Sequence, residues 1–186
     1  MMYSDIIEKM KSCGVEFSTG LSESDLRRIE NVYGIRFPRV LREFYANGVP
    51  RAVWVYDFPQ WQDFSEKNVS SIIERINAPY EWVLADLKRD RWLSRSGVRP
   101  DTDEEIESVF AEKIKSAPVM IPVCGHRYVP LIDGIDDPPV ISIVGCDSIF
   151  YGSSLEDYLR REFNMETDDM DECAHVPFWS DIIENQ

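Results

Sequence analysis

Basic residues are scarce in this sequence relative to acidic ones. The 186 residues include 20 Lys and Arg against 34 Asp and Glu, which gives a formal net charge of −14. Phosphate backbones and anionic membranes attract Lys and Arg, so an excess of acid disfavours nonspecific binding to either. We therefore expect no nucleic acid and no membrane among the partners, whereas a basic protein is compatible with this charge.

Cysteine is also sparse, and long apolar runs are absent. The four cysteines, Cys13, Cys124, Cys146 and Cys173, include no Cys-x-x-Cys pair, and a chain of this length can bury a core without disulfides. The first nine residues lack the apolar segment of a signal peptide, and no apolar run reaches the roughly 18 residues that span a bilayer. These features favour a cytoplasmic protein with reduced thiols.

Only two histidines, His126 and His175, are available for acid–base or metal chemistry. Each follows a cysteine by two positions, but neither spacing is that of a zinc finger, so we predict no metal and no cofactor. His126 could serve as a general base, yet no Gly-x-Ser-x-Gly motif supplies a nucleophile. We assign no catalytic residue and expect His126 and Arg127 to form a structural turn that binds carbonyls and carboxylates.

Hydrophobic residues make up 44% of the chain and aromatic residues 12%, which is too much for a disordered acidic protein. Apolar spacing predicts helices over 3–13, 22–34 and 38–47. Ser22 and Asp25 have the spacing of a capping box at the start of the second helix. The second and third helices are predicted to form a helical hairpin.

The middle of the chain has a less regular pattern. We predict a strand over 52–56, an aromatic-rich loop over 58–64, a helix over 69–76 that stops before Pro79, a short strand over 81–84 and a helix over 104–116. Trp54 and Phe64 are expected to lie in the core. Tyr56 and Trp61 have two interpretations, because aromatic side chains serve both in cores and as anchors of protein interfaces.

Strand signals dominate the second half of the chain. Apolar and β-branched runs predict strands over 119–123, 127–131, 140–144 and 148–151. A second capping pattern, Ser154 with Asp157, begins a helix that extends to Phe163. Helices, then adjacent strands, then a helix define the α+β class. We expect a single domain over 1–186, with the N-terminal helical hairpin packed on a mostly antiparallel sheet and a C-terminal helix.

Three groups of residues stand out by their order and spacing. They are Gly20-Leu21-Ser22 with Gly34-Ile35-Arg36-Phe37-Pro38, then Ile121-Pro122 with Gly125-His126-Arg127-Tyr128-Val129-Pro130, then Asp147-Ser148-Ile149-Phe150-Tyr151-Gly152 with the helix that follows. Together they resemble the SUKH superfamily, which includes fungal cell-wall-synthesis regulators and many bacterial toxin-immunity proteins. The resemblance covers residues 21–163. The sequence departs from it at Gly145-Cys146, where bulkier polar residues are expected, and in the acidic stretch after Phe163.

The resemblance implies a domain that binds proteins and has no shared set of catalytic residues. Bacterial members often act as immunity proteins against secreted toxins, many of them nucleases, whereas fungal relatives are scaffolds or regulators. Our leading hypothesis is a bacterial immunity protein that occludes a basic, nuclease-type toxin. A scaffold or regulator of the same fold is the alternative, and an enzyme that uses His126 is the least favoured.

The negative charge is concentrated in two windows, residues 101–107 and 166–172. Acids in the first also suit a helix N-terminus capped by Thr102, and acids in the second also suit a solvated tail. The basic stretch 88–99, which includes Trp92, either forms a solvated face or pairs with acids internally. We predict that the partner contacts Tyr56, Trp61, Asp101, Asp103, Glu104, Glu105, Glu107, Asp168, Asp169, Asp171 and Glu172.

Overall fold

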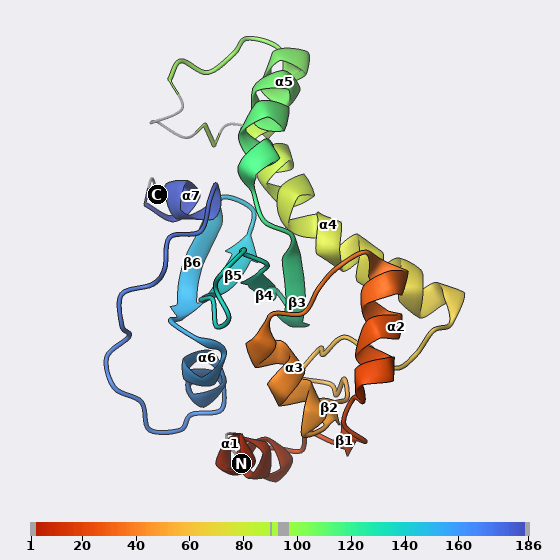
Figure 1. Cartoon of the computed structure of the whole chain (residues 1–186). Coiled ribbons are helices and arrows are strands. Elements are labelled where there is room, and N and C mark those ends of the chain that lie inside the picture. The colour runs from red at the N-terminus through yellow and green to blue at the C-terminus, as the bar shows by residue number, and fades with distance from the viewer. Residues whose placement is uncertain (1–2, 90, 93–96, 185–186) are drawn as a thin grey trace.

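The computed structural model of the chain describes residues 3–89, 91–92 and 97–184 (Figure 1). Helices precede a four-stranded sheet and further helices follow it, which confirms the predicted α+β class. The helices include α1 (Ser4–Ser12), α2 (Glu23–Tyr33), α3 (Arg39–Ala46), α4 (Glu66–Arg89), α5 (Asp103–Lys113), the short 3-10 helix η2 (Ile114–Ser116), α6 (Leu155–Glu162) and α7 (Trp179–Ile183).

The central sheet is an antiparallel meander in the order β3-β4-β5-β6. Its strands are β3 (Met120–Cys124), β4 (Arg127–Pro130), β5 (Val140–Val144) and β6 (Asp147–Gly152). Each strand pairs with the next one along the chain, with Ile121 opposite Val129 and Ile143 opposite Ser148. The strands predicted in the second half are confirmed, because apolar runs separated by turn-rich segments favour local antiparallel pairing.

Neighbouring side chains on these strands point to opposite faces of the sheet and enter two separate cores. Ile121 and Val129 face a first core built with side chains of α1, α2, α3 and α6. Met120 and Tyr128 face a second core built with side chains of α4, α5 and α7. Burial on both faces explains the continuous apolar runs of the central strands.

Helices α2 and α3 form the predicted helical hairpin. The Ser22 hydroxyl accepts a hydrogen bond from the N–H of Asp25 (3.2 Å), and the Asp25 carboxylate accepts one from the N–H of Ser22 (2.9 Å), which are the two bonds of a capping box. Gly34 ends α2 with a left-handed φ of 65°. The strands β1 (Phe17–Ser18) and β2 (Val49–Pro50) pair the segments before and after the hairpin.

The second predicted capping box is only half formed. The Ser154 hydroxyl accepts a hydrogen bond from the N–H of Asp157 (3.0 Å) at the start of α6. The Asp157 carboxylate instead accepts from the N–H of Ser153 (2.9 Å). The start of the helix is therefore as predicted, while the return bond reaches one residue further back.

Helix α4 is the largest departure from the prediction. It runs from Glu66 to Arg89 through Pro79, whereas the prediction ended a helix before Pro79 and placed a strand over 81–84. Val83 and Leu87 are buried in the second core, and their spacing of four residues is helical. Packing of this face compensates for the helix hydrogen bond that Pro79 cannot donate. The prediction considered only the cost of that missing bond and therefore ended the helix before Pro79.

The link between α2 and α3 depends on Glu30, whose side chain is only 16% exposed. Its Oε1 accepts hydrogen bonds from the N–H of Phe37 (3.0 Å) and from Arg42 (2.7 Å). Glu30→Ala removes this acceptor from both half-buried donors, so we expect the free energy of unfolding to fall by about 1–3 kcal/mol. Chemical denaturation measures the loss.

Glu23→Ala is the matched control for that variant. Glu23 binds the same Arg42 guanidinium at 2.7 Å, but its side chain is 67% exposed. An exposed ion pair contributes about 0–1 kcal/mol, so this substitution should have a smaller effect. Equal losses in the two variants would contradict the role assigned to Glu30.

Candidate functional site

Residues 52–56 form a tight turn rather than the predicted strand. Val53 and Tyr56 exchange backbone hydrogen bonds (N···O 2.9 and 3.1 Å), so Trp54 and Val55 occupy the tip. The relative exposure of Trp54 is 102% and that of Val55 is 76%. The prediction that Trp54 lies in the core is therefore wrong: the chain reverses at Trp54, and Tyr56 takes the inward position.

Two further aromatic residues of this segment, Tyr56 and Trp61, differ in exposure. Tyr56 is half-buried, with its ring centroid 4.7 Å from that of Phe163. Trp61 is fully buried and meets Tyr33 and Phe37 edge-on, at centroid distances of 5.5 and 5.1 Å. Trp61 therefore belongs to the core, and its prediction as a partner contact is wrong. Tyr56 remains a candidate contact.

Arg75 of α4 fixes the base of the Trp54 turn. Its guanidinium donates to the backbone carbonyls of Asp57 (3.1 Å) and Gly125 (3.2 Å) and lies 3.5 Å from the Asp57 carboxylate. The N–H of Gly125 donates in turn to the carbonyl of Asp57 (2.9 Å). These bonds attach the turn to the β3–β4 connection, so the sheet holds the base below the exposed tip.

The first acidic window lies at the N-terminus of α5, where some of its acids have structural roles. Thr102 and Glu105 form a capping box, which confirms Thr102 as the cap. Glu107 forms an ion pair with Lys88 of α4, which confirms internal pairing for this member of the basic stretch. The acids of the window with neither role are exposed: Asp101, Asp103 and Glu104.

The rest of the basic stretch is divided between helix capping and exposed charge. Arg99 donates to the carbonyl of Lys88 (2.9 Å) at the C-terminus of α4, where a cation is favourable. Arg89 and Arg91 are exposed and form no ion pair within the described part of the chain. Asp90 and Arg95, which the prediction also counted in this stretch, lie outside the described residues.

The second acidic window connects α6 to α7. Arg161 of α6 donates to the backbone carbonyl of Asp168 (2.8 Å), which attaches the segment to that helix. The predicted contacts in this window are all exposed: Asp168, Asp169, Asp171 and Glu172. Several of them border a hollow of about 400 Å³ with Glu156 and Asp157. The segment passes beside α6, away from α5 (Figure 1), so the structure does not join the two windows into one surface.

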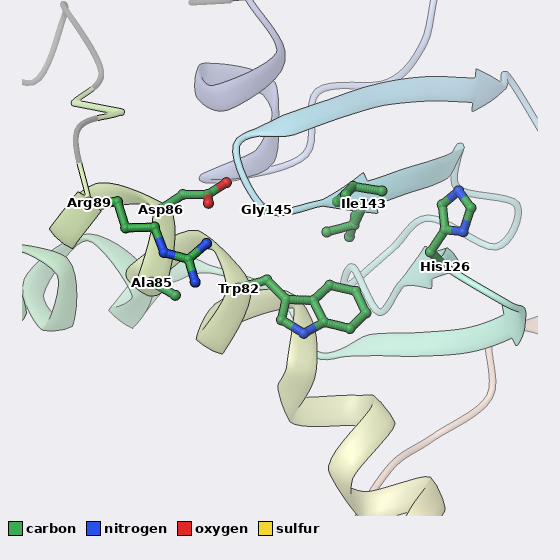
Figure 2. Close-up of a pocket in the computed structure, with 8 residues that line it drawn as sticks. Trp82, Ala85, Asp86, Arg89, His126, Ile143 and Gly145 are labelled. Carbon is green, nitrogen blue, oxygen red and sulfur yellow. The ribbon is translucent and has the colours of Figure 1, made fainter.

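A cleft that the prediction missed lies between α4 and the sheet (Figure 2). One wall is a single face of α4, with residues at i, i+3, i+4 and i+7: Trp82, Ala85, Asp86 and Arg89. The other wall comes from the end of β5 and the β3–β4 turn: Ile143, Val144, Gly145 and His126. The cleft has a volume of about 350 Å³. The helical spacing was the available signal, and the predicted strand over 81–84 concealed it.

Asp86 holds the β5–β6 turn against α4. Its Oδ2 accepts a hydrogen bond from the N–H of Cys146 (2.9 Å), and a Cβ on Gly145 would lie 2.1 Å from the same oxygen. Gly145 also has a φ of +61°, so only glycine suits the position. The choice of glycine at this position therefore has a local cause. Burial raises the pKa of the Cys146 thiol to about 11, which keeps it protonated at neutral pH.

His126 lies on the rim of the cleft and contacts Arg127. Partial burial and the Arg127 charge lower the pKa of His126. The Arg127 guanidinium lies 3.7 Å from the Glu162 carboxylate and 4.2 Å from the Tyr151 ring centroid, as expected of a structural turn. Among the described residues, those that line the cleft include no Ser, Thr or Cys.

The two Cys-x-His pairs do not gather further ligands. Within residues 3–89, 91–92 and 97–184, no group of three or more His, Cys, Asp or Glu side chains could hold a metal ion. Cys124 is buried, and burial raises the pKa of its thiol to about 12, whereas His126 faces solvent.

Comparison with family models, curated proteins and solved structures finds no match to this chain. Among the described residues, no helix combines the length and the apolar character needed to cross a bilayer. Three features therefore bear on function: the exposed Trp54 turn, the two acidic windows and the cleft on α4.

Proposed function

We propose that this chain is a non-enzymatic protein-binding domain that acts in the cytoplasm as a bacterial immunity protein and occludes a basic, nuclease-type toxin. The SUKH-like order of residues and the net charge of −14 support the assignment. The single observation that carries protein binding is the turn that presents Trp54 and Val55 to solvent.

An exposed tryptophan on a fixed turn has the properties of an interface anchor. Tryptophan supplies a large apolar area with few rotatable bonds and is enriched among the residues that dominate binding energy. The paired hydrogen bonds between Val53 and Tyr56 and the Arg75 contacts below them order the turn before any partner arrives. Such preorganisation lowers the entropy that association must remove.

The Trp54 turn and the second acidic window can share one interface. Tyr56 contacts Phe163, Trp54 is two residues from Tyr56, and Glu166 is three residues from Phe163. A residue spans at most about 3.6 Å, so the tip and the start of the window lie within roughly 30 Å of each other. A standard interface of about 800 Å² per partner has this extent. The window would then supply rim carboxylates that steer a basic partner.

Loss of the anchor is expected to weaken binding of the protein encoded by the neighbouring gene. Trp54→Ala should raise Kd at least about 30-fold, the effect of losing about 2 kcal/mol at a dominant contact. Neutralisation of the second window by Asp168→Asn, Asp169→Asn and Asp171→Asn should instead slow association and reduce its dependence on salt. Surface plasmon resonance at low and high salt separates the two effects.

Two controls locate the interface. Val98→Ser changes a residue of 95% exposure elsewhere and should leave Kd unchanged. Asp101→Asn with Asp103→Asn and Glu104→Gln tests the first window separately. A neighbouring protein that is neither bound nor neutralised would overturn the immunity role and leave the scaffold or regulator of the same fold as the better assignment.

A further inference from the structure

The cleft on α4 combines an apolar surface with Arg89, a cation that has no ion pair among the described residues. Trp82 is 41% exposed and Val144 is 54% exposed, so two large apolar side chains meet water on its walls. Figure 2 shows the Trp82 indole between the Arg89 guanidinium on one side and the Ile143 and His126 wall on the other. An incoming ring could therefore lie along the indole with Arg89 at one end.

The charges around the cleft favour an anion at the Arg89 end. Asp86 is the one carboxylate among the described residues that line the cleft, and its Oδ2 is bound to the N–H of Cys146 and packed against Gly145. Lys88, the residue before Arg89 in the helix, is neutralised by Glu107. Arg89 has no ion pair among the described residues, so its guanidinium can pair with an anion although the whole chain is acidic.

The size of the cleft limits the ligand to a small molecule. Ligand sites in proteins usually measure about 300–1,000 Å³ and are lined by apolar and aromatic side chains with a few polar groups. A cleft of about 350 Å³ lies at the lower end of that range and suits one or two fused rings. The net charge of −14 repels a long polyanion far more than a single negative group.

We propose that this cleft binds an aromatic carboxylate, with the ring stacked on Trp82 and the carboxylate paired with Arg89. Aromatic rings stack favourably in offset or edge-on arrangements, and a planar guanidinium can bind a carboxylate through two parallel hydrogen bonds. Ala85 provides the gap on the helix surface that lets the ring approach. The site needs no protein partner, so its test is independent of the proposed immunity function.

The test is a titration of the full chain with naphthalene-2-carboxylate and, separately, with naphthalene-2-carboxamide, its neutral counterpart. The indole N–H signals in ¹H–¹⁵N spectra report on binding. We expect saturable binding that shifts the Trp82 signal, with the carboxylate bound about tenfold more tightly than the carboxamide. Arg89→Gln should abolish that preference, whereas Trp82→Ala should weaken both ligands about tenfold.

Further variants separate the cleft from nonspecific adsorption. Trp54→Ala and Arg51→Gln change an exposed tryptophan and an exposed arginine outside the cleft and should leave both affinities unchanged. Ala85→Glu keeps a good helix former at an exposed position while it fills the cleft with a negative charge, so it should abolish carboxylate binding without loss of the fold. The proposal would be overturned if no saturable binding were seen or if the two ligands bound with equal affinity. It would also be overturned if Trp54→Ala weakened binding as much as Trp82→Ala.

Discussion

Trp61→Ala is expected to lower the free energy of unfolding by about 3–5 kcal/mol, the range for removal of a large buried aromatic side chain. Trp61 is fully buried, and Tyr33, Phe37 and Tyr45 surround it with ring centroids at 5.5, 5.1 and 6.4 Å. These rings come from α2, from the link that follows it and from α3. The substitution would therefore open a cavity where the loop after β2 packs on the helical hairpin.

Trp54→Ala is the matched control, because it removes the same side chain seven residues earlier in the same segment. Trp54 is fully exposed, so its loss should change the free energy of unfolding by less than about 0.5 kcal/mol. Urea denaturation of both variants, with intrinsic fluorescence and circular dichroism as separate probes, measures the difference. Similar losses in the two variants would contradict the finding that Trp61 is buried and Trp54 is exposed.

The sequence analysis placed Trp54 in the core and left Trp61 open between core and interface, because burial depends on residues distant in the chain. Both lie in one aromatic-rich segment without clear periodicity, and their rings have the same intrinsic preference for cores and interfaces. Contacts with Tyr33 and Phe37 decide the position of Trp61, while the hydrogen bonds at Tyr56 decide that of Trp54. Phe64 shows an intermediate outcome: it is half-buried, with the Arg28 guanidinium 3.8 Å from its ring centroid.

Elements with local signals were predicted well. The capping box at Ser22 and the strands of the central sheet depend on residues a few positions apart, and the structure has them where expected. Helix α4 depends on tertiary packing, since Val83 and Leu87 are buried in the second core and stabilise helix beyond Pro79. A rule based on the proline alone could not include that contribution.

The candidate sites also combine features with a local sequence signal and features that depend on tertiary packing. The acidic windows are visible as charge in the sequence, but only the structure shows that Glu105 caps α5 and that Glu107 pairs with Lys88. The cleft combines a face of α4 with the β3–β4 turn and the end of β5, segments spread over residues 82–145 of the chain. Its helical half had a recognisable spacing, whereas its other half became apparent only from the strand pairing.

Gly20→Ala is expected to lower the free energy of unfolding by about 3 kcal/mol, at the upper end of the usual range for overpacking. A Cβ at this position would lie 2.1 Å from the carbonyl oxygen of Ala46 and 2.7 Å from its carbonyl carbon. Both atoms belong to the backbone at the end of α3, so no side chain can rotate away. The N–H of Leu21 donates to the carbonyl of Tyr45 (2.9 Å), so the two segments cannot separate without the loss of that bond.

Gly34→Ala is the control, because it changes a glycine for which backbone conformation is the constraint. Gly34 has a φ of +65° and open space around an added Cβ, so only the strain of a left-handed residue is expected, about 1–2 kcal/mol. Thermal and urea denaturation of both variants compare the two causes directly. A smaller loss at Gly20 than at Gly34 would refute the steric argument. A larger one would mean that glycine is required at position 20 by contact between two backbone segments, since the φ of Gly20 is not left-handed.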